Sequence, residues 1–513
     1  MTSRRIPWLL LGLASVAAYE VPVRDTDYSR QVCTGMWGGS NAHINVSFDS
    51  TSQGQLAMVI YEWRDMEYLG KVTSMTDDSL PKTYVCTSDA MRNNFCNSSQ
   101  LGRFIIDLPE GKSVNQTSFW SARVGFGRPS GSGTPSDVST TDFWDNPDGN
   151  PVIPEDENTK YTSPWLSRSA HDAALGSLGF MSPKRRDDAL NPSPSGILWY
   201  QDPIQYQVRK TGYYCVAMVP VTVLSSSEDT TDVPYHPTYN GVVLFQNTFN
   251  GKLPATDYPK VNFYLALFLI YSILAGIWGW LCYTHVHELL PIQYYLSGLV
   301  GFLVVEMLAN FAYYRYLNAH GKGAASTVFL FVVAILDAGR NALSFFMLLV
   351  VSQGLSVVRE SLGRTMLKCQ LLAGAHFVFG VLYAVGIVEL ELESTSALVL
   401  LLFVIPLAFT LSGFLVWILY SLNHTIAQLK ARKQRYKLSM FQKLHRILMG
   451  TVLVIIIFFA VSTFTFSERL AEDYAAKTWR VRWWLLDGWL ALLYLVVFGS
   501  ICFLWRPSAN NRR

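Results

Sequence analysis

Polar and charged residues interrupt long apolar runs in the second half of this 513-residue sequence. A charge within the hydrocarbon of a membrane is costly, and it usually faces a partner or a cavity. Residues three, four and seven apart share one face of a helix. Grouped by run, the polar residues that share a face are Glu306, Asn310 and Tyr313; Asp337, Arg340, Asn341 and Ser344; His376 and Tyr383; and Asp487 and Tyr494. The candidate cavity or ligand-binding residues among them are Glu306, Asn310, Asp337, Arg340, Asn341, His376 and Asp487.

Two interpretations of these charges remain open. Counted from the predicted luminal helix ends, Glu306 lies about 10 Å deep, Asp337 about 16 Å and Arg340 about 20 Å. Three carboxylates, with Asp487 as the third, and one arginine below them indicate a polar cavity that opens to the lumen. The alternative is a buried pair of Arg340 with Asp337 or Glu306 that pins the second and third helices together. One arginine does not neutralise three acids, and both interpretations carry equal weight.

Other kinds of site have little support in the sequence. No nucleophile–base motif, metal-ligand spacing or glycine-rich phosphate loop occurs, so we expect neither an enzyme nor a cofactor. The nearest metal-like feature is His285-Val-His287-Glu288, which no further ligands accompany, and we read it as a polar loop at the headgroup level. The formal net charge of +3 is too small to indicate nucleic-acid binding. The expected partners are membrane lipids and luminal or membrane protein cargo.

The N-terminal half has the marks of the secretory pathway. A basic start, a short apolar core and small residues predict a cleaved signal peptide at 1–18. Four cysteines precede the first membrane run, Cys33, Cys86, Cys96 and Cys215, and an even number in an oxidising lumen predicts two disulfides. Three pairings are open, and we favour Cys86–Cys96 with Cys33–Cys215. The glycosylation sequons of this region begin at Asn45, Asn97 and Asn115.

A small luminal β-sandwich is predicted for residues 19–258. Segments with strand-like composition, bounded by Gly, Ser and Asp, lie at 43–48, 55–63, 103–108, 197–200, 204–208 and 212–219. Residues 126–197 lose this pattern, and their Gly, Pro, Ser and Asn content predicts a flexible insertion. No helical periodicity is evident in the domain. Such a domain is expected to bind a partner.

A bundle of seven transmembrane helices is predicted for residues 259–505, followed by a short cytoplasmic tail at 506–513. The apolar runs lie at roughly 261–283, 292–313, 326–352, 366–388, 396–420, 447–467 and 483–505. A cleaved signal places the sandwich in the lumen and the tail in the cytoplasm, and the excess of Lys and Arg in the predicted cytoplasmic segments agrees. The basic stretch Lys430–Arg446 is read as part of this topology signal, with a basic amphipathic helix on an anionic leaflet as the alternative.

Several motifs occur in order along the second half. They are Gly212-Tyr-Tyr-Cys215, Val243-Leu-Phe-Gln-Asn-Thr-Phe-Asn-Gly251-Lys-Leu-Pro-Ala-Thr-Asp257-Tyr-Pro259, Trp483-Trp-Leu-Leu-Asp-Gly488 and Leu504-Trp-Arg-Pro-Ser-Ala-Asn-Asn511. They resemble the lung seven-transmembrane receptor family, also called the Golgi-dynamics-domain seven-transmembrane proteins, and most of all its fungal PTM-type members. The resemblance covers residues from about 200 onward.

The resemblance implies a luminal Golgi-dynamics-like sandwich on a bundle similar to that of Wntless, in Golgi membranes with cycling through endosomes or the plasma membrane. It favours a role in membrane trafficking, as a sorting factor or chaperone for secretory or membrane cargo, with a lipid-binding cavity in the bundle. The alternative is a cation channel or transporter of Golgi membranes. A G-protein-coupled receptor is less favoured, because neither the Asp-Arg-Tyr nor the Asn-Pro-x-x-Tyr motif is present.

Overall fold

The computed structural model describes residues 18–27, 30–72, 82–126, 191–221, 237–355, 358, 361–392, 397–467 and 473–508. The chain divides into two compact units, which are described separately. One contains the residues up to 255 together with 475–480, and the other contains 256–474 and 481–513. The predicted signal peptide, apart from Ala18, and residues 127–190 of the predicted insertion lie outside the described residues.

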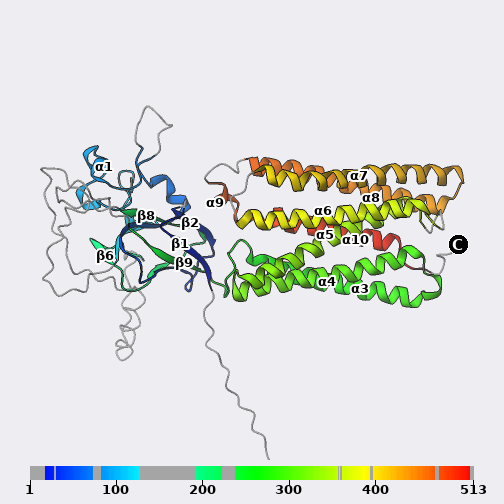
Figure 1. Cartoon of the computed structure of the whole chain (residues 1–513), viewed down its shortest axis with the longest axis horizontal. Coiled ribbons are helices and arrows are strands. Elements are labelled where there is room, and N and C mark those ends of the chain that lie inside the picture. Colours follow the sequence, from blue (N-terminus) through cyan, green and yellow to red (C-terminus); the bar gives the residue numbers. More distant parts are fainter. Residues whose placement is uncertain are drawn as a thin grey trace, which may run out of the picture. The chain divides into compact units, whose positions relative to one another are not determined.

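Two β-sheets form the first unit, which confirms the predicted all-β class (Figure 1). One sheet has the order β1-β9-β3-β7 and the other β2-β8-β4-β5-β6. All described pairings are antiparallel except the parallel pair of β5 and β6. The strands are β1 Tyr19–Arg24, β2 Gln31–Met36, β3 His43–Phe48, β4 Gly54–Glu62, β5 Trp120–Phe126, β6 Ile197–Trp199, β7 Ile204–Gln207, β8 Gly212–Val221 and β9 Asn240–Gln246.

The five-stranded sheet is covered on both faces. In β4, Leu56, Met58 and Ile60 point into the core between the two sheets. The alternate residues Val59 and Tyr61 join a second apolar cluster, which includes Leu69 and Phe104 from the chain between β4 and β5. Successive side chains of a strand point to opposite faces, so a strand that is covered twice has a continuous apolar run. This explains why residues 55–63 show no alternation.

Most of the predicted strands are confirmed, with β3 matching its predicted bounds. The strand predicted at 103–108 is wrong, because Phe104 and Ile106 make only isolated bridges, to Val85 and Leu69. Gly102, just before it, has a φ of 80°, which ends any extended run there. Strands β1, β2, β5 and β9 were missed. The short helix α1 (Ser88–Arg92) was also missed, because five residues are too few to show a period.

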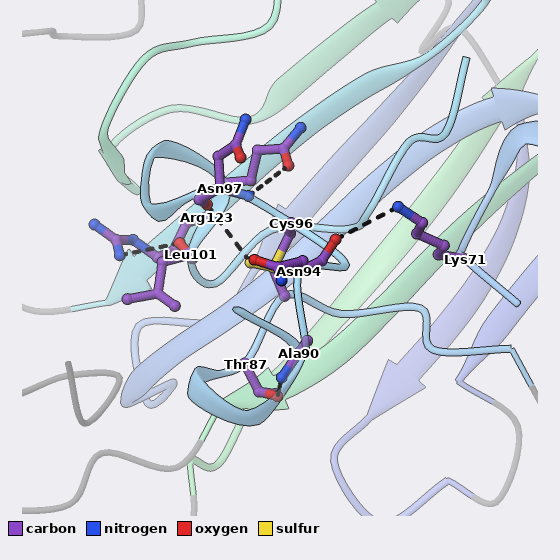
Figure 2. The surroundings of a disulfide bond; sticks show 10 residues. Lys71, Thr87, Ala90, Asn94, Cys96, Asn97, Leu101 and Arg123 are labelled. Atoms are coloured by element: carbon purple, nitrogen blue, oxygen red, sulfur yellow. Dashed lines mark hydrogen bonds between the residues drawn. A yellow bond between two sulfur atoms is a disulfide. The ribbon is translucent and has the colours of Figure 1, made fainter. Parts of the chain in front are cut away.

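The two disulfides follow the favoured pairing. Cys33 of β2 and Cys215 of β8 are direct register partners, and they are bonded to each other. Cys86 is bonded to Cys96 and closes the loop that holds α1 (Figure 2). In that loop the Thr87 side chain caps α1 by accepting a hydrogen bond from the Ala90 N–H at 3.2 Å. The Cys33–Cys215 disulfide therefore stabilises one edge of the five-stranded sheet, and the Cys86–Cys96 disulfide stabilises one loop.

Asn97 has a more accessible position than Asn45. Asn97 is exposed beside the Cys86–Cys96 loop (Figure 2). Asn45 lies in β3, between β7 and β9, and its Oδ1 is buried without a partner among the described residues. Asn115 lies in the short 3₁₀ helix Val114–Gln116, and its side chain is outside the described part of the chain.

We predict that Asn97→Gln removes one endoglycosidase-sensitive step in electrophoretic mobility, whereas Asn45→Gln changes nothing. The reason is that a glycan needs solvent around its asparagine, which the exposed loop offers and the paired strand does not. Gel mobility before and after deglycosylation measures both variants. A mobility step lost in Asn45→Gln instead would contradict the prediction.

The segment 475–480 belongs to the first unit, which corrects the predicted boundary of the bundle at 259–505. It follows the second unit's residue 474 in the chain and precedes residue 481. The Trp479 ring lies against Gly35 of β2, where a Cβ would come within 2.2 Å of the ring. Trp37 packs edge-on against Trp479 at 5.3 Å, and the Arg480 guanidinium lies 5.2 Å from the Trp479 ring. These ring contacts hold the segment 475–480 against β2. A hydropathy profile does not reveal such contacts.

Glu62, at the end of β4, has a poorly solvated carboxylate. Its side chain is 12% exposed, and a Cβ on Gly212 would lie 2.5 Å from its Oε1. Burial raises the pKa of Glu62 above its ordinary value of 4.5, although Arg64, Lys210 and Arg480 oppose this. Because the folded pKa is the higher one, this group's contribution to stability is complete below pH 4.5 and is lost as the pH rises through the folded pKa.

We therefore predict that Glu62→Gln raises the melting temperature of the chain at pH 7 relative to wild type, and that the difference disappears below pH 4.5. Melting curves of both proteins at the two pH values measure this, and the other titrating groups cancel in the comparison. A variant that melts lower at pH 7 would mean that the attraction of ionised Glu62 to the nearby cations outweighs its burial.

Long helices form the second unit, and consecutive helices from α3 to α8 pack against each other (Figure 1). Their bounds are α3 Tyr258–Thr284, α4 Pro291–His320, α5 Ala324–Ser352, α6 Arg364–Leu392, α7 Ala397–Ala431, α8 Arg435–Ser467 and α10 Trp489–Leu504. Six of them are long and apolar enough to cross a membrane. The seventh predicted span corresponds to the π-helical turn Trp484–Gly488 followed directly by α10, which has 16 residues. The short helix α9 (Tyr474–Thr478) lies between α8 and this turn.

Candidate functional site

Arg340 lies at the centre of an ionic group within the bundle. It comes from α5, and its Nη1 is 2.7 Å from Oε1 of Glu306 on α4. Its Nη2 makes an ion pair with Asp337, one turn earlier on α5. The Glu306 side chain is fully buried, whereas that of Asp337 is 49% exposed. The ion pair that pins the second and third helices is therefore formed, and it includes both carboxylates.

The depth of Glu306 differs from its predicted value. Helix α4 continues to His320, seven residues beyond the predicted run, so Glu306 lies about 21 Å from that helix end. Arg340 is sixteen residues from the start of α5 at Ala324, or about 24 Å. Glu306 therefore lies near the middle of its helix and not about 10 Å from its end, whereas Arg340 is close to its predicted depth of about 20 Å. The difference for Glu306 arises because α4 extends past its apolar run.

Polar side chains from two helices complete the group. The Ser344 hydroxyl of α5 is 2.6 Å from the Tyr494 hydroxyl of α10. The Arg340 guanidinium lies 5.3 Å from the centre of the Tyr494 ring. Asn341 donates a long hydrogen bond, 3.4 Å, from Nδ2 to Oδ2 of Asp337. Helical spacing groups Tyr494 with Asp487, and the contact between Tyr494 and Arg340 was not predicted.

The group retains unused hydrogen-bonding capacity. Glu306 Oε2 and Arg340 Nε are buried and have no partner among the described residues. The group contains two carboxylates and one guanidinium, so it holds one net negative charge when both acids are ionised. A buried, unsatisfied polar atom is costly and therefore calls for an explanation. We call Glu306, Asp337 and Arg340 the mid-bundle group. This group can accept a hydrogen bond or a cation from outside the chain.

Asp487 does not belong to this group, which corrects the expectation of three acids around one arginine. Asp487 Oδ2 is 2.7 Å from Nζ of Lys260, near the start of α3. Lys260 also pairs with Asp257 at 3.0 Å, and its ammonium lies 5.4 Å from the Tyr314 ring. Lys260 was not predicted as part of a site, because a lysine just before an apolar run is common as an anchor at the membrane surface.

His376 and Asn310 also stand apart from the arginine group. The His376 ring on α6 is 2.9 Å, through Nδ1, from the Thr410 hydroxyl on α7, and it packs edge-on against Phe345 and Phe414. Asn310 donates from Nδ2 to the backbone oxygen of Glu306 at 3.1 Å. Both are held by structural contacts. Of the predicted residues, the structure brings together Glu306, Asp337, Arg340 and Asn341.

No group of metal ligands occurs among the described residues. The histidines at 285 and 287 lie at the short 3₁₀ turn Val286–Glu288, which follows α3. His285 contacts the Leu281 carbonyl of its own helix through Nδ1 at 3.1 Å. This agrees with the interpretation of these residues as a polar turn.

Two protein families match this sequence. Residues 259–512 match the GOST seven transmembrane domain, and residues 29–124 match the PTM1-like N-terminal domain. The first covers the helical unit, and the second covers much of the β unit.

Several known proteins are similar to the chain. A Schizosaccharomyces pombe protein described as uncharacterized is 27% identical over 94% of this chain and 78% of its own length. Membrane protein PTM1 of Saccharomyces cerevisiae is 32% identical over 60% of this chain, and Transmembrane protein 87A of Xenopus tropicalis is 30% identical over 52%. The matches span 56% and 47%, about half, of the lengths of those two relatives. The sandwich, the bundle and these likenesses agree, and the chain is a multi-pass membrane protein that belongs to the GOST, or lung seven-transmembrane receptor, family.

Proposed function

We propose that this protein binds membrane and secretory cargo in Golgi and endosomal membranes and sorts or chaperones it, with the β unit in the lumen. The observation that carries the proposal is the mid-bundle group of Glu306, Asp337 and Arg340. It has one carboxylate more than its cations balance, and Asp337 is 49% exposed. A polar group at membrane depth is stabilised by a partner. A cargo segment that brings a cation or a hydrogen-bond donor to Asp337 supplies that partner.

The β unit supports a role in binding. Among the described strands, β1, β7, β2 and β6 lie at the sheet edges, and one of these, β2, is bonded to its neighbour by Cys33–Cys215. Edge strands offer unpaired backbone groups to another chain. In this proposal the β unit contacts the luminal part of a cargo protein, the bundle contacts its membrane segment, and the protein catalyses no reaction.

Proximity labelling tests the proposal in cells that lack the endogenous protein. Wild-type chain, Asp337→Asn and the control Glu110→Gln, an exposed carboxylate of the β unit, are each fused to a labelling enzyme. We expect wild type and the control to label the same set of secretory or membrane proteins, and Asp337→Asn to label that set less by about fivefold or more, the loss of a charge-assisted contact. If no such set is recovered, or if Asp337→Asn keeps it, the proposal fails.

A second function, cation transport, is favoured by one specific observation. The mid-bundle group carries a net negative charge when both acids are ionised, and its Asp337 carboxylate is half exposed. Such a group can bind a cation transiently on its way across the membrane. Liposomes with the purified chain decide this. A flux that disappears in the double variant Glu306→Gln with Asp337→Asn supports transport, and wild-type liposomes without flux exclude it.

A further inference from the structure

The basic stretch at 430–446 forms the ends of two long helices. Helix α7 ends at Ala431 and α8 begins at Arg435, so no separate amphipathic helix lies between them. Lys433 has a φ of 55°, the left-handed conformation of a tight turn. Hydrogen bonds from Gln434 N to Leu429 O and from Leu438 N to Gln434 O join the turn to both helices. The alternative of a helix lying flat on a leaflet is therefore wrong, and the cations have fixed places on a helical hairpin.

These cations have no carboxylate near them in sequence. Neither α7 nor α8 contains an Asp or a Glu. Among the described residues, no ion pair is found for the exposed cations of the hairpin, namely Lys430, Arg432, Lys433, Arg435, Lys443 and Arg446. We call these six residues the hairpin cations. Their charge is not balanced by an ion pair within the described chain.

Four of the hairpin cations, at 430, 432, 433 and 435, lie at the turn beyond the core residues Leu429 and Phe441. Lys443 and Arg446 lie on the outer surface of α8, beside the core residues Leu444 and Leu448. Leu429 and Phe441 are core residues, and Phe441 packs edge-on against Trp505 after α10. Gln293, at the start of α4, donates to the Trp505 carbonyl at 3.1 Å, so several helices end at this level. Arg435 is six residues before Phe441, or about 9 Å along α8. A headgroup layer is roughly 5–8 Å thick, and basic side chains extend further. The cations of the turn are therefore within reach of the headgroup layer, and the long side chains of Lys443 and Arg446 can extend to it from the first turns of α8.

One outward face of α8 changes from basic to apolar at this level. Lys443 and Arg446 are exposed, and Met449, Leu453 and Ile456 follow them at helical spacing and are exposed as well. An exposed apolar face on a membrane-spanning helix contacts lipid tails. The basic residues that continue the same face must then contact the headgroups of those lipids. Tyr436, 77% exposed, supplies the aromatic ring that is common at such an interface.

We propose that the hairpin cations form a binding surface for anionic lipids of the adjacent leaflet. Phosphate and carboxylate groups of these lipids replace the missing acidic partners, while their acyl chains lie along the apolar part of the same α8 face. The surface is separate from the mid-bundle group, so this proposal does not depend on the proposed cargo function. A pure topology signal acts during membrane insertion and gives no lipid preference afterwards, which separates the two explanations.

Spin-labelled lipids test the proposal on the full chain in phosphatidylcholine liposomes. The fraction of label that is motionally restricted by the protein is measured for phosphatidylserine and for phosphatidylcholine. We expect wild type to prefer phosphatidylserine by about threefold to fivefold, since one cation near an anionic surface contributes a factor of about five. The triple variant Lys430→Gln, Lys443→Gln and Arg446→Gln removes half of the hairpin cations and is expected to lower this preference clearly below the wild-type value.

A matched control removes the same charge elsewhere. The control is a triple variant of the β unit, with Lys82→Gln, Arg209→Gln and Lys210→Gln. This variant should keep the wild-type preference for phosphatidylserine. Equal melting temperatures and an unchanged glycan pattern establish that the hairpin variant is folded and correctly inserted. A wild-type protein with no preference for phosphatidylserine overturns the proposal. A hairpin variant that keeps the preference overturns the assignment to these residues.

Discussion

Replacing Arg340 with methionine is expected to destabilise the bundle by about 3–5 kcal/mol, the usual cost of removing one partner of a buried ion pair. The change leaves Glu306, which is fully buried, without the guanidinium 2.7 Å from its Oε1. It also removes the partner of Asp337 and the ring contact with Tyr494. Thermal unfolding of the purified chain and the yield of folded protein measure the effect.

A second substitution separates an ion-pair effect from a packing effect. Glu306→Gln removes the buried charge that Arg340→Met leaves behind, so the double variant should recover most of the lost stability. Lys252→Met is a control that breaks a partly exposed pair, Lys252 with Glu20, and it is expected to cost no more than about 1 kcal/mol. A double variant as unstable as Arg340→Met alone would show that the arginine acts through packing.

Removing the Cys33–Cys215 disulfide is expected to destabilise the β unit more than removing Cys86–Cys96. The bonded cysteines are 182 residues apart in the first case and 10 in the second. In the chain-entropy description, the longer loop gives about 5 kcal/mol and the shorter about 3 kcal/mol. In each variant, both cysteines of one disulfide are replaced by alanine. Denaturant unfolding, monitored by a signal from the β unit, measures the loss of stability in each variant.

The control for the disulfide variants is Cys282→Ala, which removes an unpaired thiol in α3 and should leave the β unit unchanged. Equal losses for the two disulfides would contradict the loop-length argument. A larger loss for Cys86–Cys96 would show that this bond acts mainly by holding α1 and its loop in place.

The arginine group was partly predictable because helical spacing is local. Asp337 and Arg340 are one turn apart on α5, and Glu306 lies on the helix that precedes it, so adjacent antiparallel helices bring the three together. The pair of Lys260 and Asp487 was not predictable. These residues are far apart in sequence, and only the relative register of α3 and the turn at 484–488 places them 2.7 Å apart. Single-sequence periodicity contains no information about that register.

The same distinction holds in the β unit. Strand β3 was predicted with its bounds because one of its faces is buried and the other is not, which gives strict alternation. Strand β5 was missed because all seven of its residues are buried, including Arg123. Residues 103–108 alternate without forming a strand, since Phe104 is held in a loop against the second apolar cluster. Alternation is therefore neither necessary nor sufficient, because β4 was predicted although both of its faces are covered, and β1 and β9 were missed although they alternate.

Site-specific photo-crosslinking beside Asp337 tests the cargo proposal most directly. A photoreactive residue at Val333 lies one turn before Asp337 on the same face of α5, and one at Val332, 46% exposed, points away from that face. The account predicts that Val333 captures membrane proteins in cells, that Val332 does not, and that adding Asp337→Asn abolishes the capture. Equal capture from both positions, or capture from Val333 that survives Asp337→Asn, would contradict it.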